Sequence, residues 1–320
     1  MIITLTPNPS IDRTVALASR LERGAVLRAE SVSAQSGGKG VNISRAAVAA
    51  GVPTIAVLPA AKDDPYVLEL LRDGIDCRPE RPAGPVRVNI TITEPDGTTT
   101  KINSPGATVD RAALDRLEQA LHQRAAHARW VVLAGSLPPG APADWYAELV
   151  TDLAGTAARV AVDTSDDPLR ALAAQVAVGG AAPDLMKPNG DELASLTGGD
   201  PEQIEGDPEA AAKAAAVLVD QGVGAVLATL GGNGAVLVTA EGAWHATPPP
   251  TTVVSTVGAG DSSLFGYLLG DLRGAAPAER LRLAVAYGSA AAGLPGTTIP
   301  GPDQIAPERA ELHELARTGN

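Results

Sequence analysis

The sequence predicts an α/β protein in which apolar strands alternate with helices and a small β insertion interrupts the alternation. Two observations carry this prediction. Strands such as residues 2–5 and 130–134 end in loops of small or polar residues, as expected where parallel strands finish at one edge of a sheet. Residues 86–93, in contrast, alternate strictly, and after the turn at Pro95-Asp-Gly97 a second strand follows at 98–102. A hairpin inside an α/β alternation predicts an inserted lid.

Length and composition are consistent with one large α/β domain that carries this insertion. The chain has 320 residues, 45% of them hydrophobic, which is typical of a protein that builds a core. A net charge of −12 and an aromatic content of 2% argue against nucleic acid as a partner. We therefore expect a single domain over residues 1–320, with a lid contributed by about 11–35 and 86–104.

The cellular setting predicted from the sequence is the cytoplasm. Cys77 is the only cysteine, so an intrachain disulfide is excluded and a reducing compartment is favoured. The start of the chain is apolar and lacks the basic residues of a signal peptide. The longest apolar-rich run, 223–240, is interrupted by Gly231-Gly-Asn-Gly234 and predicts two strands and a turn rather than a membrane span. No membrane association is expected.

The first strand leads into a turn-rich segment and then to Asp12. An acidic residue just past a parallel strand lies where open α/β sheets bind their ligands, although a solvated loop acid is the alternative. Residues 13–35 alternate in a way that favours short strands over a helix. Ser36-Gly-Gly-Lys-Gly-Val-Asn42 then precedes an Ala-rich helix that Gly51 is placed to terminate. In this segment Lys39 supplies a point charge and Asn42 both a donor and an acceptor, but the spacing is not that of a Walker loop.

The predicted hairpin at 86–103 carries polar side chains on one face. Arg87, Asn89 and Thr91 share that face, and Lys101 lies on the returning strand. A solvated strand face is the alternative for such alternation.

After the hairpin the α/β alternation resumes. A helix over 109–128, a strand over 130–134, a further helix, and a strand over 160–162 ending at Asp163 are expected. In Lys187-Pro-Asn-Gly-Asp-Glu192, Asn189 and Glu192 are three residues apart and would share one face of a helical first turn. That pair can orient a hydrated Mg²⁺, and a plain helix start is the alternative. Strands at 225–228 and 235–239 and an Ala-rich helix over 278–293 follow.

The stretch from Ser255 to Ser263 holds the strongest chemical signal. Gly258 and Gly260 permit backbone angles closed to other residues and allow a ligand to approach the main chain. The helix that follows would point its free N–H groups at an anion, most plausibly a phosphate. Asp261 would repel a bound phosphate unless it serves an attacking hydroxyl, and the alternative is a helix N-cap.

Taken together, the loops resemble those of the ribokinase-like sugar kinases, specifically the phosphofructokinase B branch. The resemblance covers nearly the whole chain and rests on five motifs in order: Thr6-Pro-Asn-Pro-Ser-Ile-Asp12, Gly37-Gly-Lys-Gly-x-Asn42, Gly135-Ser-Leu-Pro-Pro-Gly140, Lys187-Pro-Asn-x-x-Glu192 and Thr256-Val-Gly-Ala-Gly-Asp261. It implies a Rossmann-like, three-layer domain with a small β lid. It also implies transfer of phosphate from ATP, with Mg²⁺, to a sugar phosphate.

The resemblance assigns roles by position. Asp261 would be the base, and Gly258, Ala259 and Gly260 would form the anion hole. The sugar phosphate would be bound by Asp12, Gly38, Lys39, Asn42, Arg87 and Asn89. ATP would be bound by Lys187, Asn189, Thr229, Gly231, Gly234 and Ser289, with the metal at Asn189 and Glu192 through water. Local positive charge from the lysines, Arg87 and the metal would offset the acidic net charge.

Within the branch, Lys39 and the Arg-x-Asn pattern at Arg87 and Asn89 resemble the 1-phosphofructokinases. The expected reaction is therefore conversion of D-fructose 1-phosphate to D-fructose 1,6-bisphosphate. Tagatose-6-phosphate kinase and 6-phosphofructokinase activities are the alternatives, together with a sugar-phosphate-sensing regulator built on a kinase scaffold. The intact Asp261 and glycine motif argue against the regulator. The resemblance also implies a homodimer formed through the lid and leaves open a requirement for a monovalent cation such as K⁺.

Overall fold

A computed structural model describes residues 1–316 and is organised around a ten-stranded sheet. The strand order is β14-β13-β12-β11-β10-β9-β8-β1-β4-β5, and the strands from β5 to β11 along this order run parallel. The remaining three pair antiparallel at one edge. Their bounds are β1 Ile2–Leu5, β4 Thr54–Pro59, β5 Asp76–Glu80, β8 Trp130–Ala134, β9 Arg159–Asp163, β10 Leu185–Met186, β11 Ala225–Thr229, β12 Ala235–Thr239, β13 Gly242–Thr247 and β14 Glu311–Leu315.

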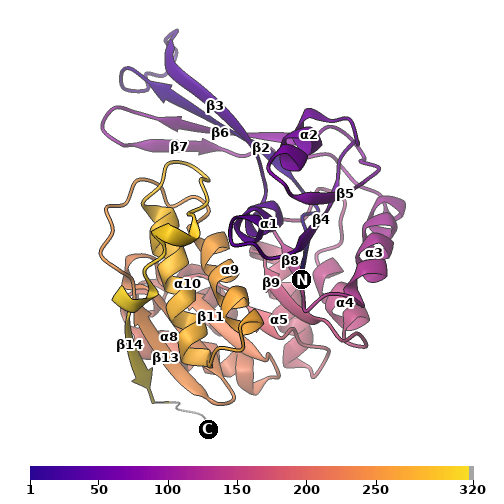
Figure 1. Cartoon of the computed structure of the whole chain (residues 1–320), viewed down its shortest axis with the longest axis vertical. Coiled ribbons are helices and arrows are strands. Elements are labelled where there is room, and N and C mark those ends of the chain that lie inside the picture. The colour runs from indigo at the N-terminus through magenta and orange to yellow at the C-terminus, as the bar shows by residue number, and fades with distance from the viewer. Residues whose placement is uncertain (317–320) are drawn as a thin grey trace.

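Helices cover both faces of this sheet, which gives the three layers that the sequence predicted (Figure 1). One face carries α3 Arg111–Ala125, α4 Trp145–Leu153, α5 Asp166–Ala177, α6 Gly190–Thr197, α7 Pro201–Gly206 and α8 Pro208–Asp220. The other carries α1 Lys39–Ala49, α9 Ala259–Leu272 and α10 Pro277–Ala292. Helix α2 Pro65–Arg72 packs at the β4–β5 end, and three short 3₁₀ helices are η1 Gly231–Asn233, η2 Pro302–Gln304 and η3 Pro307–Arg309.

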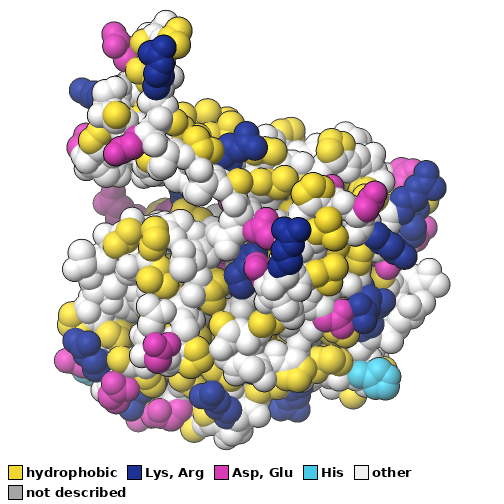
Figure 2. Space-filling model, turned by 45° about the horizontal axis from the view of Figure 1, so that its top comes forward, with side chains coloured by type: hydrophobic (Ala, Val, Ile, Leu, Met, Phe, Trp, Pro, Cys, Tyr) yellow, Lys and Arg dark blue, Asp and Glu magenta, His cyan; other side chains and the backbone are white. Residues whose placement is uncertain are grey.

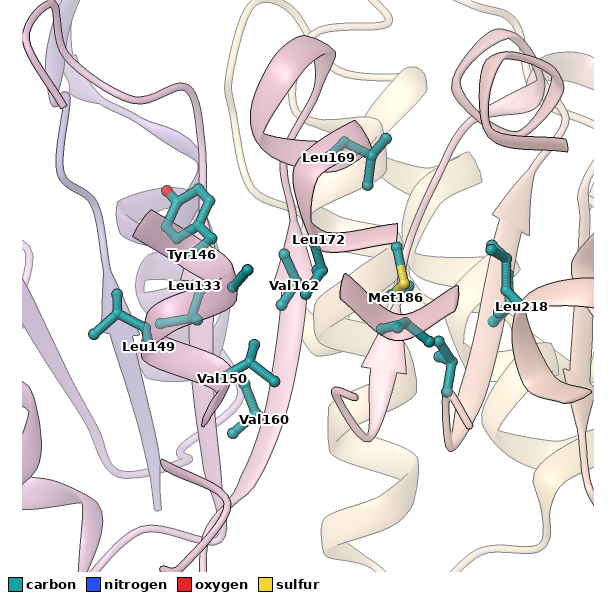
Figure 3. Packing of buried hydrophobic residues seen from close by; sticks show 14 of the residues in the cluster. Leu133, Tyr146, Leu149, Val150, Val160, Val162, Leu169, Leu172, Met186 and Leu218 are labelled. Atoms are coloured by element: carbon teal, nitrogen blue, oxygen red, sulfur yellow. The ribbon is translucent and has the colours of Figure 1, made fainter. Parts of the chain in front are cut away.

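The core forms because the parallel strands are apolar on both faces. Figure 3 shows the layer between the sheet and helices α4, α5 and α8, where Val160, Val162 and Met186 from the strands meet Leu149 and Leu172 from the helices. All of these side chains are nearly or completely buried. Strands buried on both faces are typical of parallel sheets covered by helices, and this packing fixes where the carboxyl ends of the strands lie.

A separate sheet of four strands, β3-β2-β6-β7, projects from one end of the molecule (Figure 1). Its strands are β2 Ser10–Leu17, β3 Ala29–Gly37, β6 Arg87–Thr93 and β7 Thr99–Ile102. The insertion was expected at about 11–35 and 86–104, whereas these strands lie within 10–37 and 87–102. Figure 2 shows this small sheet overhanging the body of the protein, with a hollow between the two.

The entry of the chain into the small sheet removes one alternative and corrects one helix start. Asp12 is not a solvated loop acid, because the chain turns after β1 directly into β2, where Asp12 pairs with Gln35 and Asn89 on the neighbouring strands. Helix α1 begins at Lys39 and not at residue 43. Gly38, with φ 122°, is its N-cap, and the carbonyl of Gly38 accepts from the amide of Asn42.

Ion pairs join helices α9 and α10 to the amino ends of the central strands β8 and β9. The buried carboxylate of Asp271, at the end of α9, accepts from Arg159 at 2.8 Å and from the indole of Trp130 at 2.9 Å. Arg280 lies 3.0 Å and Arg129 3.3 Å from the same carboxylate. A buried charge with this many partners joins α9 and α10 to two central strands. Within residues 1–316, no helix is both long and apolar enough to cross a membrane.

Candidate active site

A cleft of about 1060 Å³ lies between the small sheet and the carboxyl ends of the parallel strands. Residues at or just after the carboxyl ends of β1, β8, β10 and β11 line it, as do both strands of the small-sheet hairpin. Every residue assigned to the site from the sequence lies in this lining: Asp12, Gly38, Lys39, Asn42, Arg87, Asn89, Lys187, Asn189, Glu192, Thr229, Gly231, Gly234, Gly258, Ala259, Gly260, Asp261 and Ser289. The fold therefore gathers motifs from the whole chain at one site, as parallel sheets do at their carboxyl edge.

Helix α9 begins in the middle of the cleft without a side-chain cap. Gly258, the N-cap, has φ +79°, a conformation that favours glycine. Among the described residues, the amides of Gly260 and Asp261 donate to no carbonyl. A Cβ on Gly260 would lie 3.3 Å from Nζ of Lys187, so glycine leaves room for that ammonium group beside the free amides. This combination of free N–H groups, helix dipole and ammonium is suited to a phosphate.

Asp261 lies on the first turn of α9 and is not its cap, which removes the alternative considered from the sequence. Its carboxylate is buried and accepts from Nδ2 of Asn42 at 2.8 Å. Asn42 in turn is contacted through its Oδ1 by Arg45 at 3.4 Å. Helix α9 thus carries this carboxylate, and the side-chain amide of Asn42 on α1 orients one of its oxygens.

Asp163 joins the two lysines of the site. It is completely buried at the end of β9, and its Oδ1 accepts from Nζ of Lys39 at 2.6 Å. Nζ of Lys187 lies 3.2 Å from its other carboxylate oxygen. Because one carboxylate contacts both ammonium groups, it fixes the relative positions of the N-terminus of α1 and the loop after β10.

The charges in this cluster shift one another's titration. Burial, followed by repulsion from Asp163, raises the pKa of Asp261 to about 6, against the opposing effects of Lys39, Asn42 and Lys187. Burial would also raise the pKa of Asp163, but the adjacent Lys187 and Lys39 hold it below its usual value. For Lys39, burial favours a lower pKa, yet attraction to Asp163 and Asp261 keeps it above the ordinary value. Asp261 is therefore the carboxylate of the cluster that is poised to exchange a proton near neutral pH.

The small sheet contributes an acid, an amide and a guanidinium to the cleft. Asp12 accepts from the hydroxyl of Ser10 at 2.8 Å and from Nδ2 of Asn89 at 3.1 Å. Arg87 donates to the carbonyl of Ser104 at 2.9 Å and to the hydroxyl of Ser136 at 3.3 Å. Its Nε is buried and has no hydrogen-bond partner among the described residues, and burial lowers its pKa. A buried N–H without a partner is a donor available to an anionic ligand.

Asn189 and Glu192 form a reciprocal capping box at the start of α6. The Asn189 side chain accepts from the Glu192 amide at 2.7 Å, and the Glu192 carboxylate accepts from the Asn189 amide at 2.9 Å. No group of three His, Cys, Asp or Glu residues in the described part of the chain is arranged to hold a metal. The Asn189 oxygen and one Glu192 oxygen already accept backbone amides, which is compatible with a metal bound through water.

Three prolines, 248–250, also line the cleft. The hydroxyl of Ser289 donates to the carbonyl of Pro249 at 3.0 Å and lies 2.6 Å from the hydroxyl of Thr251, which also bonds to Pro249. Ser289 thus holds the proline loop against α10. Gly234 is constrained by packing, because a Cβ there would lie 1.9 Å from the carbonyl of Ala246.

Sequence reasoning missed Asp163 and left Lys101 outside the site. Asp163 is the last residue of a buried strand, at the sheet end where ligands bind, and the rule that drew attention to Asp12 could have found it. Lys101 pairs with Thr91 across β6 and β7 and lines the cleft from the small sheet. Its side of the sheet follows from the register of β7, which the sequence pattern alone does not specify.

Comparisons with known proteins agree with this geometry. The family described as pfkB family carbohydrate kinase matches residues 5–304. A 1-phosphofructokinase of Rhodobacter capsulatus is 36% identical over 310 residues, covering 95% of this chain and 94% of that protein. A 1-phosphofructokinase of Xanthomonas campestris is 36% identical over 289 residues, covering 89% of each.

A solved structure of phosphofructokinase-2 from Escherichia coli, in complex with substrates and products, superposes with a TM-score of 0.85 at 30% identity. The match covers 95% of this chain and 96% of that one. The fold, the order of the motifs and the full-length similarity therefore lead to one conclusion: the chain belongs to the pfkB family of carbohydrate kinases.

Proposed function

We propose that this sugar kinase transfers the γ-phosphate of ATP to D-fructose 1-phosphate and releases D-fructose 1,6-bisphosphate and ADP. The observation that carries the proposal is the buried Asp261, placed between the free amides of α9 and two lysines that share Asp163. The choice of sugar rests on Lys39 and on the relatives named 1-phosphofructokinase.

In this reaction Asp261 accepts the proton of the attacking sugar hydroxyl. A carboxylate whose pKa is near 6 is ionised at neutral pH and still basic enough to accept a proton during transfer. The amide of Asn42 orients the carboxylate. Phosphoryl transfer has a loose transition state, so positioning of the hydroxyl contributes more to the rate than removal of its proton.

The transferred phosphate is assigned to the N-terminus of α9. The amides of Gly260 and Asp261 and the ammonium of Lys187 would stabilise negative charge on its oxygens. Asn189 and Glu192 would orient the water shell of Mg²⁺, which when bound neutralises charge on the phosphates of ATP. The rest of the nucleotide would follow Thr229, Gly231 and Gly234 towards the proline loop held by Ser289.

The sugar phosphate is assigned to the space between α1 and the small sheet, which here acts as a lid. Helix α1, like α9, begins at the cleft without a side-chain cap, at Gly38. Two uncapped helix starts suit a reaction in which both substrates carry phosphate. Lys39 and Arg87 would contact the sugar phosphate, while Asp12, oriented by Asn89, would accept from sugar hydroxyls.

Two further features are proposed from the family. We infer a homodimer formed through the small sheet, and a monovalent cation such as K⁺ near the anion-binding loop. The E. coli relative has been solved in complex with potassium and in a tetrameric inhibited form. Size measurement in solution and activity with K⁺ replaced by Na⁺ test these two features.

The substrate assignment is tested by measuring ADP release side by side with D-fructose 1-phosphate, D-fructose 6-phosphate and tagatose 6-phosphate. The proposal expects the highest kcat/KM for fructose 1-phosphate. A higher value for either of the others would reassign the substrate. No ADP release with any of the three, although ligands bind, would favour a sensor on a kinase scaffold.

A further inference from the structure

One side-chain hydrogen bond joins the small sheet to the C-terminal half of the chain. The hydroxyl of Thr297 donates to the side-chain carbonyl of Gln35, across 262 positions of sequence. The other hydrogen bonds that the small sheet makes with the body, within residues 1–316, go to Arg45, Tyr66, Glu69 and Ser136. All of these are at its base, in the first half of the chain. The Gln35–Thr297 contact is therefore the direct polar link from this sheet to the side of the cleft assigned to the nucleotide.

Thr297 lies against the loop that carries the free amides of α9. Its Cα would be 3.8 Å from a Cβ placed on Gly258, and its side chain is nearly buried. The preceding carbonyl, of Gly296, accepts from the hydroxyl of Ser255 at 3.3 Å, and that hydroxyl accepts from the amide of Val257 at 3.2 Å. A displacement of the 296–297 segment would therefore be transmitted to the N-cap of α9 through direct contacts.

Gln35 also lies next to a residue of the part of the cleft assigned to the sugar phosphate. It is the cross-strand partner of Asp12 in the β2–β3 pair, and it is partly buried while residues 29–34 of the same strand are exposed. The β2–β3 ladder is continuous from Ser10 to Ala16, so Gln35 and Asp12 move together. One residue of the small sheet is thus tied to both sides of the cleft.

We propose that Gln35 and Thr297 are positioning residues that couple sugar binding to the geometry of the phosphate-binding loop. The inference rests on the proposed function and deepens it. When the sugar phosphate holds the small sheet over the cleft, the Gln35–Thr297 bond holds the loop around Gly258 in the conformation that accepts the phosphate of the nucleotide. Because such coupling is reciprocal, each substrate increases the affinity for the other.

Three matched substitutions test the proposal. Gln35→Met keeps the length of the side chain and removes its carbonyl, and Thr297→Val keeps the shape and removes the hydroxyl. Thr298→Val is the control, because its hydroxyl donates to Pro295 within the same loop and contacts no residue of the small sheet. The Gln35→Met/Thr297→Val double variant shows whether the two residues act as one unit.

The first measurement needs no ligand. Hydrogen exchange of the hydrogen-bonded amides of Ser255, Val257 and Ala259 should be about fivefold faster in Gln35→Met and in Thr297→Val than in the wild type, the size expected for one neutral hydrogen bond. Thr298→Val should leave it unchanged. Equal exchange in the wild type and both test variants would overturn the proposal.

The second measurement is calorimetric binding of a non-hydrolysable ATP analogue with Mg²⁺, with and without saturating fructose 1-phosphate. In the wild type the sugar should tighten binding at least fivefold. Each test variant should lose about fivefold of that gain, and the double variant should lose no more. Independent binding of the two ligands to the wild type would refute the coupling. Failure of fructose 1-phosphate to bind would refute the proposed substrate instead, and the ligand-free exchange data would still decide the role of Gln35.

Discussion

Replacing Asp261 by Asn should stabilise the protein and inactivate it at the same time. The two side chains have nearly the same shape, and the introduced asparagine would keep an oxygen that can accept from the amide of Asn42. What the substitution removes is a buried negative charge. Because the folded state raises the pKa of Asp261, it disfavours the ionised form, and the ionised carboxylate lowers the stability of the protein.

The magnitude follows from the pKa. A rise from the usual 3.8 to about 6 corresponds to about 3 kcal/mol of unfolding free energy at pH 8. A group with a raised pKa contributes stability that is fully present below the unfolded value of 3.8 and is lost as the pH rises through 6. We therefore expect Asp261→Asn to be more stable than the wild type by about 1–3 kcal/mol at pH 8, and the difference to vanish below pH 4.

Urea denaturation at both pH values measures this difference. Asp163→Asn is the matched control, since its pKa is lowered and its charge is paired with two lysines, so the loss of that charge should destabilise the protein at pH 8. In the coupled ADP assay, kcat of Asp261→Asn should fall by about 10²-fold or more. Wild-type kcat should fall as the pH drops through about 6. An Asp261→Asn protein that is less stable at pH 8 or that retains wild-type kcat would refute this reasoning.

Three further predictions address other parts of the molecule. Lys39→Ala should raise KM for the sugar phosphate far more than for ATP, and Lys187→Ala should do the reverse. Steady-state kinetics with each substrate varied in turn measures both KM values. The opposite pattern would exchange the binding roles assigned to the two lysines. Arg87→Lys should lower kcat/KM for fructose 1-phosphate by the equivalent of about 2–4 kcal/mol, because lysine cannot reproduce a forked contact with phosphate. An unchanged kcat/KM would mean that Arg87 does not bind the phosphate and contacts only Ser104 and Ser136. Asp271→Ala should lower the free energy of unfolding, measured by urea denaturation, by about 3–5 kcal/mol, because it leaves three arginines without their buried partner. A loss below about 1 kcal/mol would show that water solvates these arginines in the variant.

The sequence by itself determined the local elements and the chemistry of the site. The strands Trp130–Ala134 and Ala235–Thr239 were predicted with the bounds that the structure shows, because unbroken apolar runs between glycines and polar turns are local signals. The glycines at 258 and 260 predicted a helix start that a ligand can approach, since glycine permits the unusual backbone angle and leaves the free space that such a start requires. Parallel strands with polar ends further predicted that distant motifs meet at one edge.

Only the tertiary structure decided which side chains contact one another there. Lys39 and Asp163 are 124 positions apart, and no pattern within either segment specifies that one buried carboxylate serves both Lys39 and Lys187. The pKa of Asp261 depends on burial and on neighbouring charges, which are properties of packing. The Gln35–Thr297 hydrogen bond depends on the orientation of the small sheet relative to the main domain. Local sequence determines backbone conformation and burial along an element, whereas electrostatics depends on distances between elements, and these are set when the layers pack.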